Sequence, residues 1–118
     1  MFPDAEGQAI AYLAPHLDVP VTSEVPTPRP PQFVRVMRTG NRRLSTAHRS
    51  VQITLECWDA AGEAAAERFA DHVESLVSDW EDVPDNEDGW ISGPVPQRDP
   101  DSGCPRYVMT FVIIQTAT

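Results

Sequence analysis

The chain has 118 residues and 41% hydrophobic content, enough to bury one core, so we expect a single domain spanning residues 1–118. Its formal net charge of −9 disfavours nonspecific attraction to nucleic acid or to an anionic membrane surface. No apolar run approaches the length that spans a bilayer, and the first residues lack the pattern of a secretory signal. The two cysteines lie far apart without zinc-ligand spacing, so we expect a reducing, intracellular context.

The first part of the chain predicts one helix and one short strand. Within residues 4–17, apolar side chains recur at three- and four-residue spacing from Ile10 to Leu17, which is typical of one helical face. Pro15 indicates that the regular helix ends just before it. Residues 19–25 predict a short strand that its prolines confine to a sheet edge.

Residues 33–38 and 51–58 predict an antiparallel hairpin. The second segment alternates between apolar side chains from Val51 to Cys57 and polar ones that end with Trp58, so we expect a half-buried strand. The intervening residues 39–49 are polar and begin with a Gly-Asn turn pair. We therefore expect a long, projecting loop between the two strands.

The clearest predicted element is a helix over residues 60–80, with Asp59 as its N-cap. Its predicted buried stripe consists of Ala65, Phe69, Val73, Leu76 and Trp80. Four acidic side chains form the opposite stripe, namely Glu63, Glu67, Asp71 and Glu74.

The last third of the chain begins with an acidic loop, residues 81–89. A strand interrupted by Gly93 and by prolines is predicted over residues 90–97. Residues 107–115 are apolar on both faces and predict a central strand covered on both sides. The order of elements predicts an α+β fold, with a mixed or antiparallel sheet of about four to five strands packed by two helices.

The sequence contains no nucleophile, phosphate-loop or metalloprotease motif, and its three histidines stand apart. The acidic loop has the composition of a hard-cation site, but it lacks the ordered spacing and the closing glutamate of a calcium loop. We therefore expect no enzyme activity, no catalytic residues, no metal ligands and no cofactor.

The arginines are concentrated in one segment. Residues 29–49 hold six of the nine arginines and no acidic residue, whereas the rest of the chain is strongly acidic. Three interpretations are open: an ordinary exposed hairpin, a surface for nucleic acid phosphates, or a surface for the acidic face of a neighbouring subunit.

We favour the neighbouring subunit, because the chain carries both halves of a complementary pair. The like-charged stripe of the helix is easier to explain if a cationic surface faces it, and head-to-tail contacts of this kind close into rings. The candidate interface residues are Arg35, Arg38, Arg42, Arg43, Arg49, Glu63, Glu67, Asp71 and Glu74.

The order and spacing of several segments resemble those of tail terminator proteins of long-tailed (siphovirus-type) phages, particularly those that infect actinobacteria. The segments are an amphipathic helix, VPVTSEVP, PRPPQFVRVMRTG, a polar loop, VQITLECWD and an alanine-rich helix. The resemblance covers about residues 10–80, and the final strand also fits. Two positions depart from the family pattern: Asn41 replaces a second small residue after Gly40, and the polar loop lacks the acid expected before Val51.

The resemblance implies a small structural protein of the virion, assembled in the host cytoplasm, at the head-proximal end of the tail. Such proteins form a homo-oligomeric, hexameric ring that caps the tail tube and stops its polymerisation. Their partners are the major tail tube protein and the head–tail connector protein, and DNA passes through the lumen without sequence-specific binding. The family has no catalytic residues or cofactor to transfer to this chain.

Two alternatives remain open at this point. A head-completion or neck connector protein would share the size, the acidity and the ring assembly, and gene position would separate it from a terminator. A small nucleic-acid-binding module that uses the arginine-rich loop belongs to another class, and a low-salt binding assay would reveal it.

Overall fold

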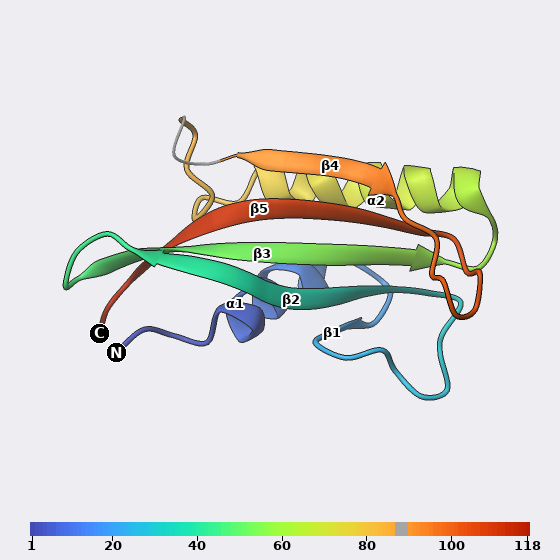
Figure 1. Ribbon diagram of the computed structural model, residues 1–118, viewed down its shortest axis with the longest axis horizontal. Helices are drawn as coiled ribbons and strands as arrows, with labels where there is room; N and C mark the ends of the chain where they lie inside the picture. Colours follow the sequence, from blue (N-terminus) through green and yellow to red (C-terminus); the bar gives the residue numbers. More distant parts are fainter. Residues whose placement is uncertain (87–89) are drawn as a thin grey trace.

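Five strands form one mixed sheet in the order β1-β2-β3-β5-β4, in a computed structural model that describes residues 1–86 and 90–118 (Figure 1). β1 pairs in parallel with β2, and the other neighbours are antiparallel. The elements are α1 (Ala5–Leu13), a 3-10 turn (Ala14–His16), β1 (Val21–Thr22), β2 (Gln32–Arg43), β3 (His48–Asp59), α2 (Glu63–Ser78), β4 (Ile91–Pro96) and β5 (Arg106–Thr116). The predicted α+β fold, with a five-stranded sheet packed by two helices, is confirmed.

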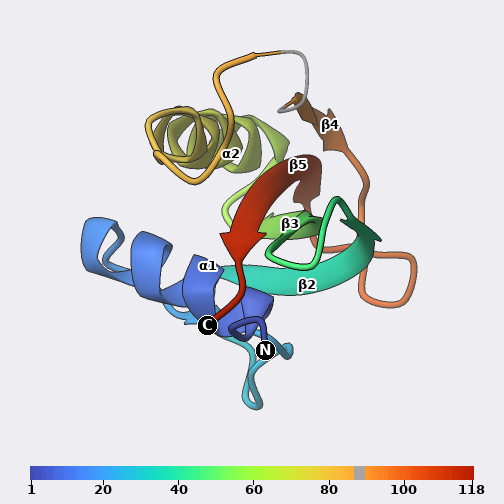
Figure 2. The same ribbon diagram turned by 90° about the vertical axis from the view of Figure 1, so that its left-hand side faces the viewer.

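Both helices cover the same face of the sheet (Figure 2). α1 packs against β1 and β2, whereas α2 packs against β3, β5 and β4. One apolar cluster fills the space between the layers, and at its centre lie Leu13, Val36, Ile53, Val73 and Phe111. The opposite side of the sheet carries no helix, and we call it the open face.

α1 begins where the sequence places it, because the Asp4 carboxylate accepts a hydrogen bond from the Glu6 N–H at 3.2 Å and caps the helix. The regular helix ends at Leu13, ahead of the 3-10 turn that contains Pro15. In the described part of the chain, no helix is long and apolar enough to cross a membrane.

The hairpin differs from its prediction. β2 and β3 stay paired as far as Arg43 and Arg49, so only residues 44–47 connect them, and the long projecting loop is not confirmed. The polar composition of this segment conceals a strand, because both its faces carry polar side chains. The register shifts between Arg38 and Gly40, which marks a β-bulge around Thr39.

β3 was predicted to be half-buried, and this is wrong for its second half. From Ile53 to Asp59 every side chain is buried. On the open face, the ring of Trp58 stacks on that of Phe33 at a centroid distance of 5.1 Å, and a group of charged side chains described below covers it.

The predicted N-cap of α2 is also wrong. β3 continues through Asp59, whose carboxylate instead accepts hydrogen bonds from the Ala61 N–H at 2.9 Å and from Gln32 Nε2 at 3.0 Å. The helix starts after Gly62, whose φ of 138° favours glycine.

The buried stripe of α2 is rotated from the predicted one. Phe69, Val73 and Trp80 are buried as expected, but Ala65 and Leu76 are only half-buried. The stripe is completed by Ala66, Ala70 and Val77. This rotation places the acidic stripe on the flank of the helix that faces β5, not directly opposite the core.

The C-terminal strands follow the predicted pattern. β4 is an edge strand with a register shift between Ser92 and Val95, a position that suits its two prolines. β5 lies between β3 and β4, and its helix-side face is buried from Tyr107 to Gln115. Its open-face side chains are mostly half-buried, so the predicted full cover on both sides is only partial. In the acidic loop, Glu87 and Asp88 lie outside the described residues.

Candidate interaction surfaces

The register of the hairpin divides the predicted interface arginines between two faces of the sheet. Successive side chains of a strand point to opposite faces. Arg43 is paired with Arg49, two positions from the core residue Val51, so both lie on the helix side. Arg42 is paired with Ser50 and lies on the open face. Arg38, paired with the core residue Ile53, lies on the helix side as well, and the bulge that follows it brings Arg43 to that same side.

The helix-side arginines form a cluster around Phe2. The guanidinium groups of Arg49 and Arg43 lie 4.5 and 5.1 Å from the centroid of its ring. Arg49 Nε donates to Gln115 Oε1 at 2.6 Å, and Arg38 Nη2 donates to Asn41 Oδ1 at 2.6 Å. These neutral partners fix the orientation of the arginines without cancelling their charge.

Charges of like sign are close together in this cluster. Within residues 1–86 and 90–118, no ion pair joins Arg38, Arg43 or Arg49 to a carboxylate. Burial lowers the pKa of Arg49, and the neighbouring charges of Arg38 and Arg43 lower it further. An external anion would relieve this repulsion, so the cluster is suited to an acidic partner.

Arg42 stands on the open face, and its side chain makes no hydrogen bond or ion pair with the described residues. It borders two shallow hollows. One has a volume of 540 Å³ and includes Leu44 and Ile114, and the other, of 440 Å³, includes Trp90 and Val112. A cation beside exposed apolar and aromatic side chains is a composition common at the centres of protein interfaces.

The acidic stripe lies far from these arginines in the same chain. The hairpin connection joins β3 at His48, whereas α2 starts just beyond the other end of β3, roughly 36 Å away for twelve residues. The helix runs back along the sheet and reaches Glu74 after about 16 Å, still short of the hairpin (Figure 1). Glu67 accepts a hydrogen bond from the Tyr107 hydroxyl at 3.3 Å, and Glu63 lies 3.9 Å from Arg98 in an exposed pair. Burial raises the pKa of Tyr107, and the charge of Glu67 raises it further. Asp71 and Glu74 have no ion pair within the described chain.

Arg35 lies apart from the other four arginines of the predicted interface. It lies on the open face toward the opposite end of β2 and pairs with Glu56 at 3.5 Å. Its Nε atom is buried and has no hydrogen-bond partner, so its guanidinium group keeps donor capacity.

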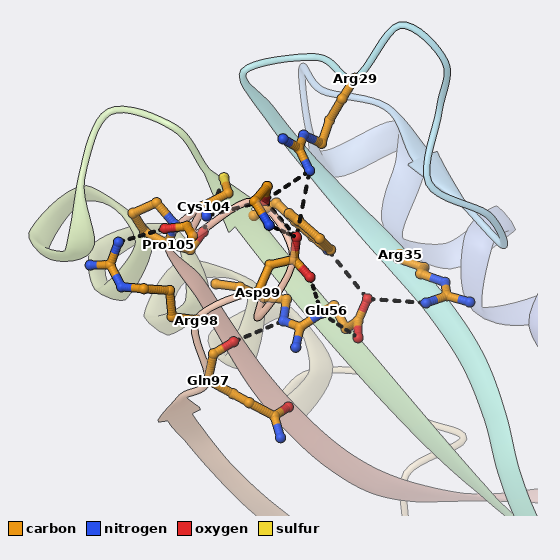
Figure 3. Close-up of polar contacts among 12 residues, drawn as sticks. Arg29, Arg35, Glu56, Gln97, Arg98, Asp99, Cys104 and Pro105 are labelled. Carbon is orange, nitrogen blue, oxygen red and sulfur yellow. Dashed lines mark hydrogen bonds and ion pairs between the residues drawn. The ribbon is translucent and has the colours of Figure 1, made fainter.

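A charged cluster that the sequence did not predict surrounds Trp58. Figure 3 shows its members Arg29, Arg35, Glu56 and Asp99. The guanidinium groups of Arg29 and Arg106 lie 5.4 and 5.0 Å from the centroid of the Trp58 ring. Arg106 pairs with Glu56 at 3.2 Å and with Asp99 at 3.9 Å, and Arg29 reaches Asp99 at 3.8 Å. We call these five residues, together with Arg35, the Trp58 cluster.

The Trp58 cluster holds the segment 97–105 against the open face. Asp99 is the anchor, because its carboxylate also accepts hydrogen bonds from the Ser102 hydroxyl and the Ser102 N–H. The Ser102 hydroxyl is the main cause that lowers the pKa of Asp99, with Arg106 contributing. One signal in the sequence pointed to this cover: Trp58 stands on the face of β3 that otherwise carries polar side chains.

The helix layer also carries a hollow, of 440 Å³, between the end of α1 and α2. His16, Asp18, Asp59 and His72 line it. In the part of the chain that the structure describes, no group of three or more His, Cys, Asp or Glu side chains is arranged to hold a metal ion.

Comparison with models of known protein families finds no match, and comparison with curated proteins finds none either. The candidate surfaces must therefore be interpreted from their own chemistry.

Proposed function

We propose that this chain is a tail terminator of a siphovirus-type phage: a structural virion protein that forms a ring, caps the tail tube and presents a surface for head–tail joining. The proposal combines the resemblance in segment order with the distribution of charge in the folded chain. Its interface is drawn from the candidate arginines of β2 and β3 and from the acidic flank of α2.

One observation carries this proposal. The arginines at the hairpin end and the acids Asp71 and Glu74 lie on separate parts of the molecule, and within the described residues no ion pair joins either group to an opposite charge of the same chain. Because the two surfaces are complementary but lie too far apart to meet in one chain, they are suited to head-to-tail contacts between copies. Repeated contacts of this kind close into a ring when the rotation between subunits allows it.

The proposed mechanism is passive. A ring seated on the last layer of the tube covers the sheet edges and contact surfaces that the next tube subunit would use. Growth then stops without any chemical step, and the opposite side of the ring is left for the connector protein. The acidic balance of the chain, −9 overall, disfavours adhesion of the DNA that passes through the lumen.

The test is assembly and capping by the purified protein. Light scattering gives the molar mass, negative-stain images show whether rings form, and added tail tube protein shows whether elongation stops. The double variant Arg42→Glu/Arg43→Glu is expected to weaken assembly, and assembly of the wild type should itself weaken as the salt concentration is raised. Arg68→Glu, on the exposed side of α2 away from the hairpin, is the control for the change of charge.

Rings and normal capping by the double variant would contradict the proposed interface. Rings that never bind tube ends but bind connector protein would favour the neck-protein alternative. The unpaired arginines also keep the nucleic-acid-binding module testable: DNA retention at low salt that the double variant abolishes would support that module in place of a terminator.

A further inference from the structure

We propose that the open face of the sheet is the surface that receives the acidic flank of α2 from a second copy of the chain. This inference rests on the homo-oligomer of the proposed function and specifies which faces meet. It assigns the contact to Arg35 and Arg42, and not to the three helix-side arginines.

The middle of the open face is a ladder of hydrogen-bonding side chains across three strands. Gln52 Nε2 donates to Thr39 Oγ1 at 3.1 Å, and that hydroxyl lies 2.9 Å from Thr54 Oγ1. Thr54 Oγ1 in turn lies 3.1 Å from Thr110 Oγ1 on β5. Hydroxyl groups can rotate their protons toward a new acceptor, so this ladder can donate to carboxylates placed over it.

Cations stand on both sides of this ladder, along β2. Arg35 lies toward the end of the sheet that holds the Trp58 cluster, and Arg42 lies toward the hairpin. Among the described strand residues of this face, the one carboxylate is Glu56, which is already paired with Arg35 and Arg106. The open face therefore offers donors in excess of acceptors, and its complement is a surface rich in carboxylates.

The acidic flank of α2 fits this pattern in charge and in length. From Glu63 to Glu74 the helix rises about 16 Å, and Arg35 and Arg42 are separated by roughly 20 Å along β2. The exposed residues beside the acids include Ala64 and Ser75, whose small side chains allow a close approach to the sheet. Docking at the Arg42 end would also cover Trp90, which lines a hollow with Arg42 and is 44% exposed.

The geometry also explains why such a contact would extend beyond a dimer. The open face and α2 belong to opposite layers of the fold, as Figure 2 shows, so the two partners of a contact use different surfaces. An open chain of copies then keeps one unused surface of each kind, one at each end, until a ring closes.

Two neighbouring arginines provide a matched test. Arg42→Glu and Arg43→Glu change the charge equally at adjacent positions of one strand, but on opposite faces. We expect Arg42→Glu to raise the dissociation constant of the oligomer at least tenfold in sedimentation velocity, and Arg43→Glu to change it less than threefold. The inferred contact places Glu74, which has no ion pair within the described chain, opposite Arg42 of the other copy. Adding Glu74→Arg to Arg42→Glu should therefore restore association, because a pair of opposite charges is re-formed. Unchanged circular dichroism and melting temperature establish that each variant is folded.

A cross-linking experiment tests the contact without changing charge on the sheet. In a Cys104→Ser background, mixing Thr110→Cys and Asp71→Cys chains under mild oxidation should give disulfide-linked dimers. Cys57 does not interfere, because it is fully buried and burial raises the pKa of its thiol. Arg43→Cys mixed with Asp71→Cys is the control and should give few.

The outcomes separate this inference from the proposed function. Stronger disruption by Arg43→Glu than by Arg42→Glu, or equal cross-linking in the control mixture, would overturn the assignment of the open face while ring formation and capping stand. Wild-type rings that fail to cap tubes would overturn the proposed function while the contact between the two faces stands. A wild-type chain that stays monomeric and gives no cross-link would overturn both.

Discussion

Arg106→Met should strongly destabilise the fold, although Arg106 lies far from the predicted interface. Its side chain is only 11% exposed, and it pairs with Glu56 at 3.2 Å and with Asp99 at 3.9 Å. Its Nε also donates to the Gln97 carbonyl at 2.8 Å, and its guanidinium group covers the ring of Trp58. Methionine keeps part of the packing and removes all of these polar contacts.

The magnitude follows from what remains behind. Removing one partner of a buried pair costs about 3–5 kcal/mol, since the other charge stays buried. The lost cation–π contact adds about 1 kcal/mol. Arg35 remains 3.5 Å from Glu56 and offsets part of the loss, so we expect a net cost of about 3 kcal/mol in the free energy of unfolding. For a chain of this size the melting temperature should fall by about 12 °C.

The assay is urea unfolding followed by tryptophan fluorescence, at one protomer concentration because assembly also contributes to stability. Arg98→Met is the matched control, because it makes the same change of charge in the same segment. The side chain of Arg98 is 57% exposed and its ion pair with Glu63 is 3.9 Å long, so this variant should cost less than about 1 kcal/mol. If Arg106→Met were no more destabilising than Arg98→Met, the Trp58 cluster would not hold the segment 97–105 as described.

Two further predictions concern pH and backbone geometry. The pKa of Asp99 is lowered in the folded state, so the ionised side chain stabilises the fold fully above the ordinary aspartate pKa near 4, and this contribution is lost as the pH falls toward the folded-state pKa. In the Asp99→Asn variant, the free energy of unfolding should therefore fall less steeply below about pH 4. Identical dependence of stability on pH in the variant and the wild type would refute this. At Gly93, φ is 93° and an added Cβ would lie 2.7 Å from the Val108 carbonyl oxygen, whereas Gly62, with φ of 138°, has nothing within 4 Å. Gly93→Ala should therefore lower the urea midpoint clearly more than Gly62→Ala, which carries only a backbone cost of about 1–2 kcal/mol, and equal losses would contradict the close approach.

The sequence was sufficient for the elements whose hydrophobic pattern is regular. The alternation from Val51 to Cys57 and the apolar run of β5 predicted two strands that the structure contains. Phe69 and Val73 predicted a buried face of α2, although not its exact rotation. These signals succeed because burial of one face repeats with the period of the element.

The arginine-rich segment was predicted less well for a physical reason. From Thr39 to Arg43 both faces of the strand are polar, so period two leaves no hydrophobic trace, and the bulge at Thr39 changes the parity of every later residue. Arg42 and Arg43 therefore looked alike in the sequence, although they lie on opposite faces. Asp59 was mistaken for a cap because an aspartate just before a helix also suits the last residue of a strand.

The Trp58 cluster was beyond prediction from local pattern. Arg29, Glu56, Asp99 and Arg106 come from four segments, and only the tertiary fold brings them to one ring. Each is unremarkable in its own segment. The only signal in the sequence was a tryptophan on an otherwise polar strand face. That signal indicates that other residues cover the ring, but not which residues they are.

The two chain ends meet at the hairpin end of the molecule (Figure 1). The amino group of Met1 donates to the Thr118 carbonyl at 3.1 Å, and the Thr118 N–H donates to the Met1 carbonyl at 2.8 Å. A purification tag at either end would thus sit beside Phe2 and the arginines that contact its ring. A circular permutant, with residues 118 and 1 joined by a short linker and new ends opened in the exposed segment 23–28, would move every appendage to a distant part of the surface.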